Sequence, residues 1–61
     1  MEPLWARVEI SKTAESIAPY WRGKIGHLVA WKHDQWYTVL VEGKELMLDA
    51  DRAEFKVVEG N

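Results

Sequence analysis

The 61-residue sequence contains no cysteine, so neither a disulfide bond nor a thiolate metal site can stabilise its fold. A chain of this length forms one domain, residues 1–61, and buries only about 60% of the surface that the unfolded chain exposes. Stability must therefore come from dense side-chain packing. Self-association into a homo-oligomer is a second source of burial open to such a chain.

The sequence also lacks clustered charge and long apolar runs. Lysines and arginines are spread almost evenly, and the net charge is −2. Nucleic acid is therefore not the expected partner, because phosphate binding requires a concentrated basic face. The longest apolar run, residues 28–31, is far too short to span a membrane, and Glu2 stands where a signal peptide carries positive charge. We expect a soluble, cytoplasmic domain that does not bind membranes.

Four tryptophans are the most informative residues that the sequence does contain. Trp21, Trp31 and Trp36 bracket the two stretches with the strongest strand character, residues 24–32 and 35–42. Each large ring can bury about 150–250 Å², so a few tryptophans can supply much of the buried surface of a small core. Where such rings stay exposed, they indicate a contact surface.

Apolar residues at alternate positions predict β-strands, because successive side chains of a strand point to opposite faces. Val8 and Ile10 show this period of two, as do Leu46 and Leu48. Gly43 favours a tight turn, since glycine adopts a positive φ without strain. The pattern predicts five strands, at residues 4–10, 24–32, 35–42, 44–49 and 54–58.

Two connections interrupt the alternation. Residues 11–22 form a long first connection, in which Thr13 favours the start of a short helical turn and Pro19 prevents a longer helix. Residues 49–53 contain turn and cap residues and no strand former, which predicts a short 3-10 turn before the last strand.

This order of elements resembles the SH3-like small barrel, whose first loop is long and whose last strand follows a 3-10 turn. The Gly-Lys-Ile-Gly-x-Leu-Val stretch at residues 23–29 is similar to the second strand of that superfamily, and residues 48–55 are similar to its 3-10 turn and last strand. The resemblance implies an all-β fold, a five-stranded SH3-like barrel. From the apolar phase of each strand we expect these core residues: Val8, Ile10, Ile25, Val29, Val39, Val41, Leu46, Leu48 and Phe55, with Trp31 in addition.

The sequence offers no constellation for catalysis or metal binding. A metal site needs three or four converging ligands, whereas His27 lies among apolar strand residues and His33 in a polar turn. The carboxylates near residues 42–45 and 49–51 flank turns, where turn formation and capping account for them. We therefore expect no catalytic residue, no metal ion and no cofactor.

One enzyme family provides a further alternative. Residues 21–25, Trp-Arg-Gly-Lys-Ile, are similar to the start of the second strand in type II plasmid dihydrofolate reductases, SH3-like chains whose active site is a pore formed by four subunits. The Val-Gln-Ile-Tyr strand that binds ligands in that family corresponds here to Glu-Leu-Met-Leu at residues 45–48. Residues 45–48 contain neither glutamine nor tyrosine, which argues against ligand binding of this kind. An oligomeric enzyme of the dihydrofolate reductase type is therefore the less favoured alternative.

In SH3-like domains the ligand groove lies between the long first loop and the turn that joins strands two and three. The resemblance places aromatic residues near that groove, and we expect at least one of Trp21 and Trp36 to be exposed. The expected function is a non-enzymatic protein-interaction module or a small accessory subunit, with single-stranded nucleic-acid binding as the alternative. The predicted partner-binding residues are Tyr20, Trp21, Trp36, Tyr37, Trp5, Arg22 and Lys32.

Overall fold

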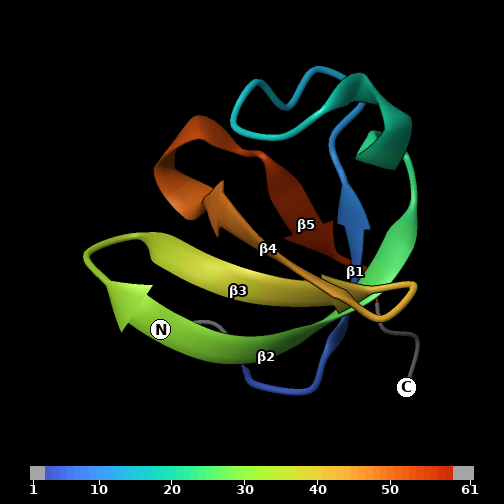
Figure 1. The fold of residues 1–61 in the computed structure, drawn as a ribbon. Coiled ribbons are helices and arrows are strands. Elements are labelled where there is room, and N and C mark those ends of the chain that lie inside the picture. The colour runs from blue at the N-terminus through green and yellow to red at the C-terminus, as the bar shows by residue number, and fades with distance from the viewer. Residues whose placement is uncertain (1–2, 59–61) are drawn as a thin grey trace.

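The computed structural model describes residues 3–58 and contains one antiparallel β-sheet that curls around its own core (Figure 1). Its strands hydrogen-bond in the order β4-β3-β2-β1-β5. Within the described residues, no pairing between the edge strands β4 and β5 closes the sheet. The strands are β1 (Arg7–Ile10), β2 (Ile25–His33), β3 (Trp36–Val41), β4 (Lys44–Asp49) and β5 (Phe55–Val57), and two 3-10 helices, η1 (Pro19–Trp21) and η2 (Ala50–Arg52), precede β2 and β5.

The predicted all-β class, the five strands and the 3-10 turn before the last strand are confirmed. β1 is the strand that differs most from its prediction, since it begins at Arg7 rather than at residue 4. The reason is Trp5, whose φ of 69° lies in the left-handed region and interrupts the extended backbone. The fifth strand is predicted at residues 54–58, and β5 is one residue shorter at each end, Phe55–Val57.

The first connection contains a helical turn, but not at Thr13. There the Ser11 hydroxyl accepts the Thr13 backbone N–H at 3.0 Å, a local bond that competes with helix formation. The turn forms instead at Pro19–Trp21, because proline fixes φ near the helical value at the first helical position. The Arg22 N–H donates to the Pro19 carbonyl at 3.1 Å, the hydrogen bond expected of a 3-10 turn.

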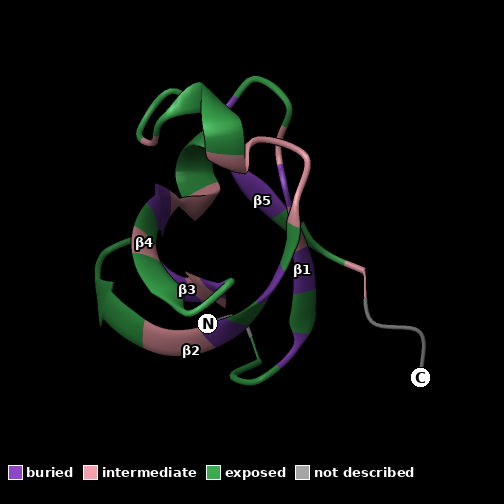
Figure 2. Cartoon of the chain, turned by 45° about the vertical axis from the view of Figure 1, so that its right-hand side comes forward, coloured by how far each residue is buried: buried purple, intermediate pink, exposed green. Residues whose placement is uncertain are grey.

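The concave face of the curled sheet forms the core, and every strand contributes at least one buried position (Figure 2). Six of the predicted core residues are buried: Val8, Ile10, Val39, Val41, Leu48 and Phe55. Leu46 is half-buried and packs against this cluster, and Val29 is half-buried as well. Tyr37, Leu28 and Ala14 complete the buried cluster.

The predicted phase of β2 is wrong at its beginning. Gly26 and Leu28 face the core, whereas Ile25 is 50% exposed. A Cβ atom on Gly26 would lie 2.6 Å from the Leu40 carbonyl oxygen and 2.9 Å from Val39 Cγ1. A real side chain never approaches backbone so closely, so the inward position must be glycine, and Ile25 takes the outward one.

The second half of β2 is displaced by a β-bulge. The register against β3 shifts between Leu28 and Ala30, which brings Trp31 opposite Tyr37 near the end of the hairpin. The predicted burial of Trp31 is wrong, since this residue is 47% exposed. Its indole N–H donates to the Asp34 carbonyl at 2.9 Å, so the polar edge of the ring is satisfied without burial.

Truncation of Leu48 to alanine should lower the free energy of unfolding by about 2–4 kcal/mol. Leu48 is fully buried and lies opposite Tyr37 in the β3–β4 ladder, so its loss leaves a cavity that rigid neighbours cannot fill. The matched control is Met47→Ala, the exposed neighbour on the opposite face, for which we expect a change within about 0.5 kcal/mol. Urea unfolding measures both; a midpoint shift below about 0.5 M at unchanged slope for Leu48→Ala would contradict its burial.

Within residues 3–58, no helix has the length or the apolar character needed to cross a membrane.

Candidate functional site

The structure does not gather the predicted contact residues on one surface. Tyr20 and Trp21 belong to η1, and the Tyr20 hydroxyl donates to Glu42 Oε1 at 3.0 Å, just beyond the end of β3. Trp36 begins β3 at its opposite end. At about 3.3 Å per residue, the length of β3 places Trp36 roughly 20 Å from Glu42. Tyr20 and Trp36 therefore do not contact each other, and they lie near opposite ends of β3.

The prediction that Tyr37 belongs to the contact surface is wrong. Its side chain is 2% exposed and points into the core, where the ring packs edge-on against Phe55 with centroids 5.7 Å apart. The physical reason is the position of β3 between β2 and β4, which buries three consecutive residues of this strand. An aromatic residue in a central strand fills the core, whereas sequence alone does not distinguish central from edge strands.

The most exposed tryptophans are not the two for which the sequence predicts exposure. Trp21 and Trp36 are both half-buried, and Trp21 packs against the core cluster. The exposed rings belong to Trp5, at 67%, and to Trp31. Trp5 precedes β1 and donates its backbone N–H to the Leu28 carbonyl, so it lies apart from η1.

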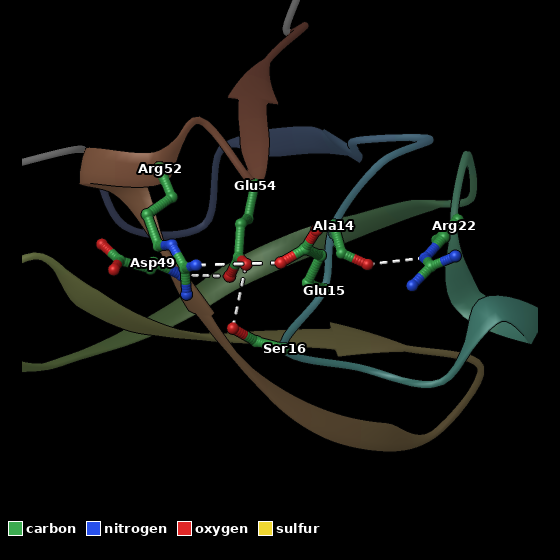
Figure 3. A network of polar contacts seen from close by, with 7 residues as sticks. All are labelled: Ala14, Glu15, Ser16, Arg22, Asp49, Arg52 and Glu54. Atoms are coloured by element: carbon green, nitrogen blue, oxygen red, sulfur yellow. Dashed lines mark hydrogen bonds and ion pairs between the residues drawn. The ribbon is translucent and has the colours of Figure 1, made fainter.

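The two predicted basic rim residues also separate. Lys32 is exposed near the end of the β2–β3 hairpin. Arg22 follows η1 but is half-buried, and its Nε–H donates to the Ala14 carbonyl at 2.5 Å (Figure 3). Arg22 therefore joins two parts of the first connection and stabilises its fold.

One group of residues does form a defined surface, which we call the aromatic corner: Tyr20, Trp21, Lys24 and Glu42. The Tyr20 and Trp21 rings meet edge-to-face, with centroids 4.7 Å apart and planes at 87°. Lys24 Nζ lies 4.4 Å from the centroid of the Tyr20 ring and 3.2 Å from Glu42 Oε2. Tyr20 is nonetheless 62% exposed. The ring is thus fixed on three sides and open to solvent on another.

The local backbone explains why this corner forms. Gly23, with φ of 81°, redirects the chain from η1 into β2, a conformation that other residues rarely adopt. Its N–H donates to the Ile10 carbonyl at 2.8 Å, which anchors η1 beside the end of β1. Lys24 then leads into β2, while Gly43 completes the β3–β4 turn and presents Glu42. Two turns that contain glycine therefore bring the four side chains together.

Glu42 carries a negative charge in this corner. The hydrogen bond from the Tyr20 hydroxyl lowers its pKa most, and the hydrogen bond and charge of Lys24 lower the pKa further. Burial raises the pKa, but the lowering effects prevail. At neutral pH the corner therefore combines aromatic faces, a carboxylate and an ammonium group.

A second polar cluster centres on Glu54, which is only 3% exposed (Figure 3). Glu54 Oε2 accepts the Ser16 hydroxyl at 2.9 Å, and Oε1 accepts the Asp49 N–H at 2.9 Å. The backbone N–H groups of Glu15 and Ser16 also donate to this carboxylate. Beside this carboxylate, Arg52 Nη2 lies 3.8 Å from Glu15 Oε1 in an exposed ion pair. The carboxylate joins the first connection to the end of β4.

Burial raises the pKa of Glu54, but the hydrogen bonds from Asp49, Ser16 and Glu15 together outweigh this effect. The net pKa of Glu54 lies below its usual value. A carboxylate that is ionised and already accepts several donors is poorly suited to take a proton from a substrate. We therefore assign Glu54 a structural role.

Hollows in the described residues lie away from the aromatic corner. One, of about 400 Å³, lies beside β1 and β5, another, of about 380 Å³, beside Trp5 and Val57, and a third, of about 260 Å³, beside Thr13 and Arg52. Within residues 3–58, no three histidine, cysteine, aspartate or glutamate side chains lie close enough to hold a metal ion. The aromatic corner is therefore the best-defined candidate for a contact with another molecule.

Sequence reasoning missed Lys24 and Glu42 as members of the site. Lys24 lies in a predicted strand and Glu42 in a predicted turn, and both look like ordinary solvated charges. Their contact with Tyr20 depends on how η1 folds back onto the β3–β4 turn, which no local pattern encodes.

Comparisons of the chain with protein-family models, with curated proteins and with solved structures found no match. Function must therefore be inferred from the chemistry of the site itself.

Proposed function

We propose that the chain is a cytoplasmic, non-enzymatic protein-interaction module or small accessory subunit, built on an SH3-like barrel. The strand order β4-β3-β2-β1-β5, the long first connection and the 3-10 helix before β5 favour that barrel. The curl of the sheet in Figure 1 brings β4 and β5 toward each other, with η2 between them.

The orientation of Tyr20 carries the proposal. Its ring is held by Trp21, by Lys24 and by Glu42, and yet most of it faces solvent. A ring that is already fixed loses little conformational freedom on binding, so its contact area contributes to affinity at low entropic cost. Tyrosine and tryptophan are also among the residues most enriched where binding energy concentrates.

The direction of the pKa shifts argues against Glu42 and Glu54 as a general acid or base. A general acid or base at neutral pH needs a carboxyl pKa that is raised toward 7. The pKa values of Glu42 and Glu54 are both lowered by their hydrogen bonds. Both groups are therefore weak bases and are already ionised at neutral pH.

The proposal predicts a partner that contacts position 20. The photo-crosslinking residue p-benzoylphenylalanine, placed at Tyr20 in the cell of origin, should yield one discrete protein adduct. The matched control places it at Trp5, which is about as exposed. The Trp5 backbone bonds to Leu28, four residues and thus roughly 13 Å further along the chain than Lys24 of the corner. Adducts of equal yield from both positions, or from neither, would overturn the assignment.

With the purified partner, Tyr20→Ala should weaken binding by tenfold or more, because a central aromatic contact is typically worth at least about 1.4 kcal/mol. Trp5→Ala should change the affinity by less than about twofold. Calorimetric titration measures both, and unchanged circular dichroism spectra confirm that the variants are folded. A loss of affinity with Trp5→Ala that equals the loss with Tyr20→Ala would place the contact elsewhere.

A further inference from the structure

We infer that the aromatic corner recognises an arginine side chain of the partner, which takes the place that Lys24 occupies in the free chain. This inference rests on the proposed function and specifies the partner's chemistry: a peptide segment that presents an exposed arginine.

The first argument is that the corner already binds a cation. The Lys24 ammonium lies 4.4 Å from the centre of the Tyr20 ring and 3.2 Å from Glu42 Oε2. The face of an aromatic ring carries partial negative charge, so ring and carboxylate both favour a positive group. Lys24 is therefore an internal occupant that shows which kind of ligand the corner accommodates.

The second argument is that an arginine fits this geometry better than Lys24 does. A guanidinium group is planar, so it can stack on the Tyr20 ring while two of its N–H groups point at one carboxylate. Glu42 Oε1 already accepts the Tyr20 hydroxyl, and Oε2 becomes available when Lys24 leaves. The Lys24 ammonium is a point charge and cannot make this paired contact.

The third argument is that Lys24 can leave at little cost. Its side chain is 30% exposed, and the ion-pair partner Glu42 is more exposed still. An exposed lysine–carboxylate pair contributes little, since water solvates both groups when they part. The four-carbon stem of lysine is flexible enough to carry its ammonium group into solvent.

The charges around the corner favour a cation over an anion. An acidic side chain that paired with Lys24 would lie against the Glu42 carboxylate and the negative face of Tyr20, both of which repel it. Lys44 and Glu45 follow in the same chain segment and offset each other in charge. Arg22 is held by the Ala14 carbonyl.

The test uses the full chain and four short capped tripeptides, acetyl-Gly-X-Gly-amide, in which X is arginine, lysine, citrulline or glutamate. Citrulline has the shape of arginine without its charge. Nuclear magnetic resonance detects binding through the Tyr20 ring and Trp21 indole signals. We expect the arginine peptide to shift these signals most, the lysine peptide less, and the citrulline and glutamate peptides not at all.

Two variants separate displacement of Lys24 from a general effect of charge. Lys24→Ala vacates the corner and should tighten binding of the arginine peptide roughly threefold to fivefold, the scale of one exposed cation–aromatic contact. Lys44→Ala removes the same charge from the neighbouring turn and should change binding by less than about twofold. Glu42→Gln should reduce the preference for arginine over citrulline, because only the Tyr20 ring then favours the charged group. Amide spectra establish that each variant is folded.

Equal responses to arginine and citrulline, or equal affinities of Lys24→Ala and Lys44→Ala, would overturn the inference. A corner that responds to citrulline or glutamate would still be a contact surface, so the proposed function would stand without the arginine. If no peptide shifts the Tyr20 and Trp21 signals in any variant, the inference fails, and the crosslinking adduct at position 20 decides the proposed function separately.

Discussion

Replacement of Gly26 by valine should lower the free energy of unfolding by about 3 kcal/mol or more, most of the stability that so small a domain holds. The added atoms would point into the core, where the Leu40 carbonyl oxygen and the Val39 and Val41 side chains already meet the Gly26 backbone. Relief requires that β2 moves away from β3, which breaks ladder hydrogen bonds and opens the core. Circular dichroism and urea unfolding measure the loss.

Two other positions serve as controls for Gly26. Ile25→Val lies next to it in β2 but faces solvent, and should change stability by less than about 0.5 kcal/mol. Gly43 has a φ of 79°, and a Cβ atom added there would meet no other atom within 4 Å. Gly43→Ala therefore tests backbone strain alone, at about 1–2 kcal/mol. A loss for Gly26→Val no larger than the loss for Gly43→Ala would contradict the close approach of β2 and β3.

Replacement of Glu54 by alanine should lower the free energy of unfolding by about 3 kcal/mol or more. The carboxylate accepts the Ser16 hydroxyl and the N–H groups of Asp49, Glu15 and Ser16. Its removal leaves these donors without an acceptor in a site that water reaches poorly, and each unsatisfied donor costs about 1–3 kcal/mol. The control Glu15→Gln removes an exposed ion pair with Arg52 and should cost at most about 1 kcal/mol.

Acid should act on stability through the same carboxylate. The pKa of Glu54 in the folded chain is lower than its usual value of about 4.5, so the unfolded chain binds a proton more tightly. The contribution of Glu54 to stability is therefore complete above the usual pKa and is lost as the pH falls through the lowered pKa of the folded chain. Glu54→Gln lacks this titration, so its stability should fall less steeply between about pH 5 and about pH 3, limits set by the usual carboxyl pKa. Parallel pH profiles for the two proteins would contradict the role of Glu54.

The sequence was sufficient for the strands because their signals are local. Alternating apolar residues and the turn at Gly43 predicted the bounds of β4, and capping residues predicted η2. The strand β2 was also predicted, but the burial predicted for its first residues was wrong, for an equally physical reason. Gly26 has no side chain, so the hydrophobic pattern of the sequence does not show that it faces the core. The apolar Ile25 beside it therefore led to the wrong prediction of which residues of β2 point inward.

The candidate site was predictable only in part. Tyr20 and Trp21 are adjacent in sequence and could be paired from it, whereas the contact of Tyr20 with Glu42 joins η1 to a turn far along the chain. Tyr37 shows the converse difficulty. Its aromatic character fits a surface and a core equally well, and only the order of strands in the sheet decides between them.

The pairing of β1 with β5 has a consequence for how the chain folds. Val8 lies opposite Val57, and the Val58 N–H donates to the Arg7 carbonyl at 2.9 Å, so β1 is completed by a strand that follows it only after three others. β2, β3 and β4 form neighbouring hairpins and can pair early. β1 can pair with β2, but its contact with β5 and the hydrogen bonds of the Glu54 carboxylate form only when residues 54–58 are in place. We expect folding to be slow for so small a fold, since residues 8–10 and 55–57 are far apart in sequence and the loop between them has to close before the final contacts form. Until residues 54–58 emerge, Val8 and Ile10 lack their partners in β5, and the nascent chain depends on dilution or chaperones to avoid association.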